Sequence, residues 1–148
     1  QRVRALNRVL DLLNGIRAPR VAMLGIAFKP HTDDVRESPA HWLACALAAV
    51  DVRVTATDPW ALGRAAFTSP NIRCTGSAIE AAEGADAVVL ATEWPEFVAL
   101  DWEQIAGRMR GDVVFDARNA LDARAVRAAG LRYASLGRDV AGADEASA

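Results

Sequence analysis

The sequence predicts an α/β fold, namely a doubly wound, Rossmann-like and mostly parallel sheet with helices on both faces, preceded by the end of a longer helix. Two observations lead to this fold class. Nearly continuous apolar runs at residues 20–28, 86–92 and 112–116 are typical of central parallel strands, which are covered on both faces. Segments with helical patterns alternate with these runs at the spacing of βαβ units.

The first helix is expected at residues 3–14, where apolar residues recur at helical spacing and Asn14-Gly15 supplies a stop. Ser38 as N-cap and Pro39 at the first helical position predict a second helix that runs to about residue 50. The other expected elements are strands at 52–56, 72–75 and 131–136, the last at a sheet edge, and helices at 77–83, 94–110 and 122–129.

The length of 148 residues suits one domain with a sizeable core, and a hydrophobic content of 52% excludes a disordered chain. We expect three parts: 1–18 as the end of a central dimerisation helix plus linker, 19–138 as the α/β domain, and 139–148 as a flexible tail.

The net charge of −2 is balanced along the chain and offers neither a basic face for nucleic acid nor a polybasic membrane patch. The chain also shows no bilayer-length apolar run and no signal-peptide pattern, which favours a cytoplasmic protein. Cys45 and Cys74 lie far apart in apolar segments, so we expect buried thiols in a reducing compartment. His31 and His41 do not add the ligands that a zinc site needs.

The loop at residues 29–37 follows the first predicted strand, where a Rossmann-type domain places its phosphate loop. Gly25 stands alone there, so the Gly-x-Gly-x-x-Gly cradle for a dinucleotide pyrophosphate is missing. Lys29 is the only lysine among the 17 lysine and arginine residues, and its ammonium suits phosphate oxygens. Thr32, Arg36 and the helix start at Ser38 could add further phosphate contacts.

A structural alternative stands beside this interpretation. Lys29 and Arg36 could instead pair within a solvated loop with Asp33, Asp34 and Glu37.

Polar residues also follow the other predicted strands. Asp58 could bond ribose hydroxyls, but Asp58-Pro59 is equally a turn former, and we favour the turn. Arg118 could meet the same ligand as Lys29, or it could pair with Asp116, Asp122 or Glu93. Trp94, Trp102 and Cys45 are expected to be core or interface residues.

The segment 25–39 strongly resembles the C-terminal UDP-sugar-binding domain of the UDP-glucose/GDP-mannose dehydrogenase family. The resemblance rests on Gly25-Ile26-Ala27-Phe28-Lys29-Pro30, Thr32-Asp33-Asp34 and Arg36-Glu37-Ser38-Pro39, followed in order by Asp58-Pro59, Ala85-Asp86-Ala87, Thr92-Glu93-Trp94, Phe97, Asp116, Arg118-Asn119, Leu121-Asp122, Gly130-Leu131, Tyr133 and Leu136-Gly137-Arg138. It spans roughly residues 20–138.

The resemblance implies a domain of an NAD-dependent nucleotide-sugar 6-dehydrogenase, of the UDP-glucose to UDP-glucuronate type, in polysaccharide biosynthesis. Phe28, Lys29 and Arg118 would bind the UDP-sugar, and Arg36 would reach toward NAD held mainly by a domain outside this chain. The rest of the same enzyme would be the partner, in a homodimer. The sequence does not settle whether the nucleotide is UDP or GDP, or which sugar is oxidised.

No catalytic residue is expected in this chain, because the NAD glycine motif and the nucleophilic cysteine of the family have no counterpart in the sequence. The chain alone would therefore be inactive. One alternative is a free-standing nucleotide-sugar-binding or regulatory module without catalysis, which a start codon just before Gln1 would favour. Another is an NAD-binding Rossmann protein with a degenerate glycine loop, which would bind NAD but not UDP.

Overall fold

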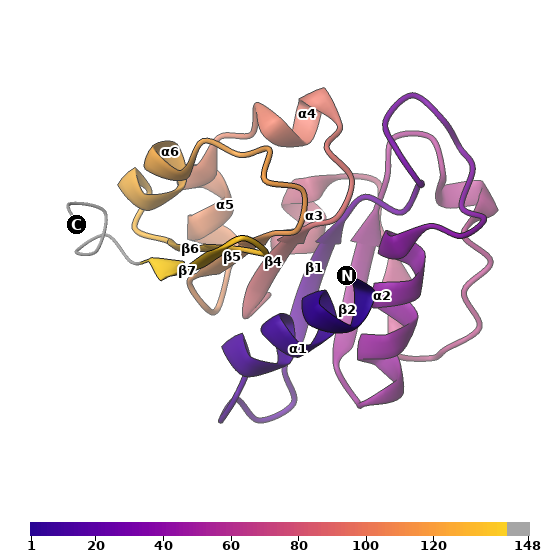
Figure 1. Ribbon diagram of the computed structural model, residues 1–148, viewed down its shortest axis with the longest axis horizontal. Coiled ribbons are helices and arrows are strands. Elements are labelled where there is room, and N and C mark those ends of the chain that lie inside the picture. Colours follow the sequence, from indigo (N-terminus) through magenta and orange to yellow (C-terminus); the bar gives the residue numbers. More distant parts are fainter. Residues whose placement is uncertain (142–148) are drawn as a thin grey trace.

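The computed structural model of the chain describes residues 1–141 and contains one seven-stranded sheet in the order β3-β2-β1-β4-β5-β6-β7 (Figure 1). The strands are β1 (Arg20–Leu24), β2 (Arg53–Thr57), β3 (Ile72–Cys74), β4 (Ala87–Leu90), β5 (Val113–Asp116), β6 (Arg132–Ser135) and β7 (Arg138–Ala141). All neighbouring strands pair in parallel except β7, which is antiparallel to β6. The predicted doubly wound, mostly parallel sheet is confirmed.

Helices cover both faces of the sheet (Figure 1). One face carries α1 (Arg2–Leu12) and α2 (Pro39–Ala49), and the other carries α3 (Ala78–Ala82), α4 (Pro95–Val98), α5 (Trp102–Arg108) and α6 (Ala123–Ala128). A 3-10 turn, η1 (Leu62–Arg64), follows β2. No helix within residues 1–141 has the length and apolar character needed to cross a bilayer.

The helix starts follow from capping side chains. The Ser38 hydroxyl accepts a hydrogen bond from the backbone N–H of His41, and Pro39 begins α2 at a position where the missing N–H costs nothing. Ser77, Asp101 and Asp122 cap α3, α5 and α6 in the same way. These caps were predicted for α2 and α3, and they fix where each helix begins.

Helix α1 packs directly on the sheet. Ala5 and Val9 of α1 are buried, and so is Leu13 just beyond it. They belong to the same core cluster as α2 and the strand residues that face α2. Helix α1 thus contributes to the core of the α/β domain.

Two expectations about the chain's end and its thiols differ from the structure. The strand at 132–135 is not at the sheet edge, because residues 138–141 add β7 beside it; the rest of the predicted tail, 142–148, lies outside the described residues. Cys45 and Cys74 are both exposed free thiols. Cys45 is on the outer face of α2, since Leu43, Ala44 and Leu47 take the positions that face the sheet.

Strand β1 stops at Leu24, earlier than the apolar run suggests, because the chain turns sharply at Gly25. Gly25 has a φ of +108°, and its N–H donates to the carbonyl of Thr57 at 2.8 Å. A Cβ built at this position would lie 2.4 Å from Cβ and Oγ1 of Thr92. Only glycine lets the end of β1 lie this close to the segment after β4.

Replacing Gly25 with alanine should therefore lower the free energy of unfolding by at least about 3 kcal/mol, since it adds both a steric overlap and backbone strain. Urea denaturation followed by circular dichroism measures this loss. Gly63→Ala is the matched control, because Gly63 lies at negative φ in η1 with no atom within 4 Å of an added Cβ. Equal stability of the two variants would contradict the packing argument.

Candidate functional site

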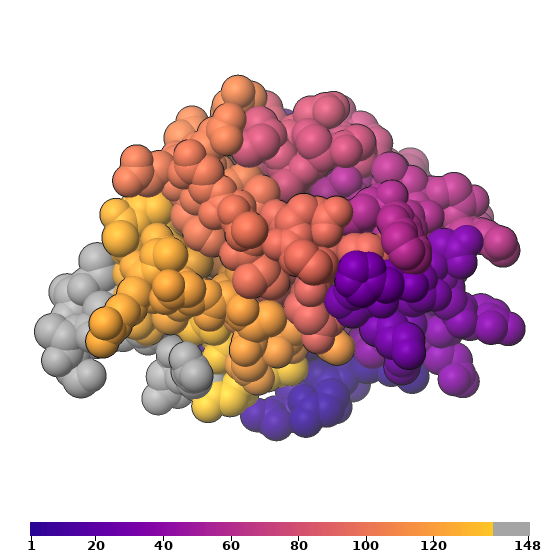
Figure 2. Space-filling model, turned by 90° about the horizontal axis from the view of Figure 1, so that it is seen from above, coloured from indigo at the N-terminus to yellow at the C-terminus, as the bar shows by residue number. Residues whose placement is uncertain are grey.

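The loops that follow β1, β2, β4 and β5 gather at one edge of the sheet. The doubly wound order places the crossover point between β1 and β4, where ligands of open α/β sheets bind. Figure 2 looks onto this edge and shows the dark purple segment after β1 against the coral segment after β4. The described geometry of this edge defines the candidate site.

A buried carboxylate, that of Asp58 after β2, organises the edge. Its Oδ2 accepts hydrogen bonds from the backbone N–H groups of Ile26 at 2.8 Å and Ala27 at 3.0 Å, and from the indole Nε1 of Trp94 at 3.1 Å. Its Oδ1 accepts two more, both at 2.9 Å, from the N–H groups of Trp60 and Ala61. Asp58 is 2% exposed, so its carboxylate exchanges water for five protein donors.

Side chains from two other elements fix the same stretch of backbone. The Ser38 hydroxyl donates to the carbonyl of Ile26 at 2.6 Å, and the Thr92 hydroxyl donates to the carbonyl of Ala27 at 2.8 Å. Both the N–H and the C=O of Ile26 and Ala27 are therefore bonded. The backbone that leads to the next two residues is held from β2, α2 and β4 at once.

Phe28 and Lys29 come directly after this fixed stretch and are both exposed. The N–H of Phe28 donates to the carbonyl of Asp34 at 2.8 Å, which closes the loop. Within residues 1–141, the ammonium of Lys29 takes part in no hydrogen bond or ion pair. The structure thus presents an unpaired cation next to a rigid anchor.

Arg36 behaves differently from Lys29. Its guanidinium pairs with the Asp34 carboxylate through two hydrogen bonds of 3.0 Å, although the Arg36 side chain is 87% exposed. These bonds, together with the N–H of Arg36, lower the pKa of Asp34 from 3.8 to about 2. Asp33 pairs with Arg64. The predicted alternative of loop ion pairs is therefore right for Arg36 and wrong for Lys29.

An aromatic cluster lies against the loop. His31 makes edge contacts with Trp60 and Trp94 at centroid distances of 5.8 and 5.3 Å. Trp94 is buried, as predicted, and its indole is bonded to Asp58, whereas Trp60 is 55% exposed. Trp102 is buried too, so neither of the two tryptophans expected in the core is a stacking platform.

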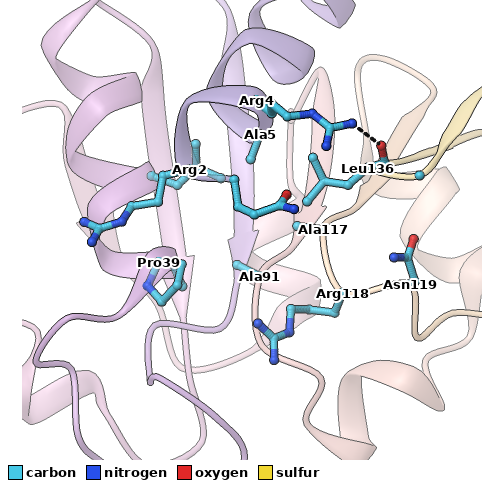
Figure 3. Close-up of a pocket in the computed structure, with 13 residues that line it drawn as sticks. Arg2, Arg4, Ala5, Pro39, Ala91, Ala117, Arg118, Asn119 and Leu136 are labelled. Carbon is cyan, nitrogen blue, oxygen red and sulfur yellow. Dashed lines mark hydrogen bonds between the residues drawn. The ribbon is translucent and has the colours of Figure 1, made fainter.

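A pocket of about 470 Å³ opens between the first turn of α1 and the ends of β4, β5 and β6. Arg118 and Asn119 line it from the loop after β5, and Arg2 and Arg4 from α1 (Figure 3). Arg4 donates to the carbonyl of Leu136 at 3.3 Å. Lys29 does not line this pocket.

The loop that carries Arg118 is itself held by a buried acid. Asp116 accepts hydrogen bonds from the N–H groups of Arg118 at 3.1 Å and Leu121 at 2.8 Å, and from the hydroxyl of Tyr133 at 2.8 Å. The Arg118 guanidinium pairs with Glu93 at 3.1 Å, one of the three ion pairs that the sequence left open. The other oxygen of Glu93 is buried without a hydrogen-bond partner.

Two further groups expected to hold phosphates are already bonded within the domain. The Thr32 hydroxyl accepts from the N–H of Asp34, and the Ser38 hydroxyl is buried between Ile26 and His41. Sequence reasoning missed Arg2 and Arg4, because they meet Arg118 only through the packing of α1 on the sheet, and it assigned no role to Asn119, the chain neighbour of Arg118. It did place Asp58 in a turn, and the structure confirms that turn.

The turn after β1 does not fit the pyrophosphate of a dinucleotide. In dinucleotide-binding turns the backbone amides are free to approach the phosphates. Here the amides of Ile26 and Ala27 donate to the Asp58 carboxylate, which places negative charge where a phosphate would need donors. The turn after β1 therefore does not offer the pyrophosphate of NAD a cradle of free backbone amides.

Fold and site together define a Rossmann-like α/β domain that carries side-chain cations at the carboxyl ends of its strands. Residues 22–123 match the UDP-binding domain of the UDP-glucose/GDP-mannose dehydrogenase family. The chain belongs to this family.

Known proteins with similar sequences and structures agree. The UDP-glucose 6-dehydrogenase of Rhizobium meliloti (strain 1021) is 40% identical over 93% of this chain and 32% of its own length. The structure of a UDP-D-ManNAc dehydrogenase from Pyrococcus horikoshii superposes with a TM-score of 0.76 at 31% identity, over 93% of this chain and 31% of that one. The structure of a UDP-glucose dehydrogenase from Pyrobaculum islandicum superposes with a TM-score of 0.74 at 30% identity, over 93% of this chain and 30% of that one. The chain thus spans about a third of these relatives.

Asp58→Asn should destabilise the domain by about 3 kcal/mol or more, because an amide nitrogen replaces one acceptor oxygen and leaves buried N–H donors unbonded. Chemical denaturation measures the loss. Asp101→Asn is the control: Asp101 caps α5 at the surface, where asparagine caps as well as aspartate. A similar small effect of both substitutions would show that Asp58 does not organise the edge.

The Asp34–Arg36 pair predicts a pH dependence. Because the pKa of Asp34 is about 2 in the folded chain, against about 3.9 in unfolded peptides, the pair favours folding above pH 4 and loses this effect as the pH falls toward 2. Carboxyl carbon shifts in NMR spectra report the pKa directly. Arg36→Gln should raise it toward 3.8, whereas Arg124→Gln on distant α6 should leave it unchanged; an unmoved pKa in Arg36→Gln would contradict the assignment.

Proposed function

We propose that this chain is the UDP-sugar-binding domain of an NAD-dependent UDP-sugar 6-dehydrogenase, which oxidises the sugar in concert with parts of the enzyme outside this chain. The observation that carries the proposal is Lys29, whose exposed ammonium has no partner within residues 1–141 and follows a backbone segment fixed by three elements. A compact ammonium that has no partner in the described part of the chain suits a diphosphate.

Phe28, Lys29 and Arg118 are the proposed substrate contacts. Lys29 would meet the phosphates, and the exposed ring of Phe28 lies next to it in the chain. Arg118 lines the pocket at the end of β5, and its contact with Glu93 leaves its side chain 33% exposed. A nucleotide that engages Arg118 would compete with the Glu93 carboxylate for it, which favours a ligand of high negative charge.

Arg36 is proposed to face NAD that is bound by another part of the enzyme. Its 87% exposed side chain supports a role toward a partner surface, and its pairing with Asp34 holds the guanidinium in one orientation. The similarity to a third of the length of the dehydrogenases supports a larger enzyme that brings the NAD site, the nucleophile and a dimer interface. The chain by itself is proposed to bind and not to oxidise.

Titration calorimetry of the chain with UDP tests the proposal. We expect weak binding, in the millimolar range, because the remainder of the cleft would come from elsewhere. Lys29→Ala should weaken it about tenfold, and Lys29→Arg about threefold, since a guanidinium keeps the charge but not the compact geometry.

Arg124→Gln is the charge-matched control, because Arg124 is exposed on α6 away from the strand ends. It should bind UDP like the unmodified chain. Absence of binding at millimolar UDP, or equal affinity for Lys29→Ala and the unmodified chain, would overturn the assignment of Lys29.

A further inference from the structure

The opposite edge of the sheet carries three arginines that the proposed function does not use. Arg20 and Arg53 begin β1 and β2 and are direct register partners, and Arg73 on β3 is the partner of Thr55, two residues beyond Arg53. Because side chains alternate along a strand, all three arginines lie on the same face of three adjacent strands. Like charges placed side by side on neighbouring strands destabilise a sheet.

This face is the one that α3 covers. Ala22, two residues after Arg20, is in the core with α3, and a Cβ built on Gly84 after α3 would lie 3.3 Å from Nη1 of Arg20. The three arginines line one pocket of about 440 Å³ together with Thr55, Asn71 and Glu83. Its size is within the range of small-molecule sites.

The acids near this pocket form their ion pairs with other arginines. Asp86 accepts two hydrogen bonds from Arg110, at 2.8 and 2.7 Å, as well as the backbone N–H of Arg20. Burial alone would raise the pKa of Asp86, but these bonds and the charges of Arg110 and Arg20 lower it instead. Glu83 pairs with Arg108 at 3.5 Å.

Within residues 1–141, the guanidinium groups of Arg20, Arg53 and Arg73 have no ion pair or hydrogen bond of their own. Three guanidinium groups without an ion-pair partner on one face of the sheet attract an anion, and planar guanidinium groups match phosphoryl oxygens in bidentate geometry. A single carboxylate would neutralise only one of them.

We propose that this pocket binds a small anion with at least two phosphoryl groups, such as pyrophosphate or the polyphosphate tail of a nucleotide. The site is distinct from the candidate UDP-sugar site, because it lies at the amino ends of β1, β2 and β3, at the lower edge of the sheet in Figure 1. The length of β1, roughly 15 Å at about 3.3 Å per residue, separates the two edges.

NMR titration of the isotope-labelled chain with pyrophosphate tests the proposal. Amide signals of Arg20, Arg53 and Arg73 should shift with one saturable dissociation constant, and the shifts should weaken as NaCl is raised. Arg53→Gln and Arg73→Gln should each raise that constant about tenfold. Lys29→Ala should leave it unchanged, which separates this site from the nucleotide-sugar site.

Two further variants sharpen the test. Arg124→Gln removes the same charge from exposed α6 and should not affect pyrophosphate binding. Glu83→Gln removes the acid that lines the pocket and should tighten binding. Titration with ATP distinguishes the two possible ligands. An affinity for ATP equal to that for pyrophosphate supports a site that binds phosphoryl groups alone, and tighter binding of ATP supports a nucleotide ligand.

Three results would overturn the proposal. The first is the absence of shifts at millimolar pyrophosphate. The second is a set of shifts confined to residues 25–38, which would place the anion at the opposite edge. The third is an equal effect of Arg124→Gln and Arg53→Gln, which would show that net charge, and not the pocket, governs binding.

Discussion

The buried carboxylate of Asp58 is the constraint on which the functional edge depends. With no cation against it in the described structure, its burial is tolerable only because five N–H groups converge on it. Those donors come from the loop after β1, the turn after β2 and Trp94 after β4. Because the buried Asp58 carboxylate needs these donors, it fixes three segments that are far apart in sequence. Gly25 and Thr92 complete the close packing between β1 and β4.

This constraint also determines what kind of ligand the edge can accept. A dinucleotide-binding turn keeps its amides free for phosphates, whereas this turn has donated them internally to Asp58. Recognition of an anion here must therefore come from side chains that project beyond the fixed backbone. Lys29 meets that requirement and Arg36, bound to Asp34, meets it less well.

Local signals predicted most of the fold, and long-range contacts account for what was missed. The apolar strands, and the Ser38 and Ser77 caps, depend on neighbouring residues and were placed within a few positions. Strand β7 was missed because its sequence lacks an apolar pattern. The exposure of Cys45 depends on which face of α2 meets the sheet, and an alanine-rich helix has little amphipathic pattern to reveal that face.

The contrast between local and long-range contacts also applies to Arg36, Arg118 and Lys29 of the proposed site. Arg36 could be assigned to Asp34 from sequence, because the partners are two residues apart, but the Arg118–Glu93 pair joins loops after two different strands. Lys29 is left unpaired because Asp33 and Asp34 are each taken by an arginine, one of them from η1. These ion pairs thus occupy the two adjacent aspartates that could otherwise neutralise Lys29. Because Arg36 and Arg64 pair with these aspartates, Lys29 is the cation of this loop that has no ion pair in the described structure.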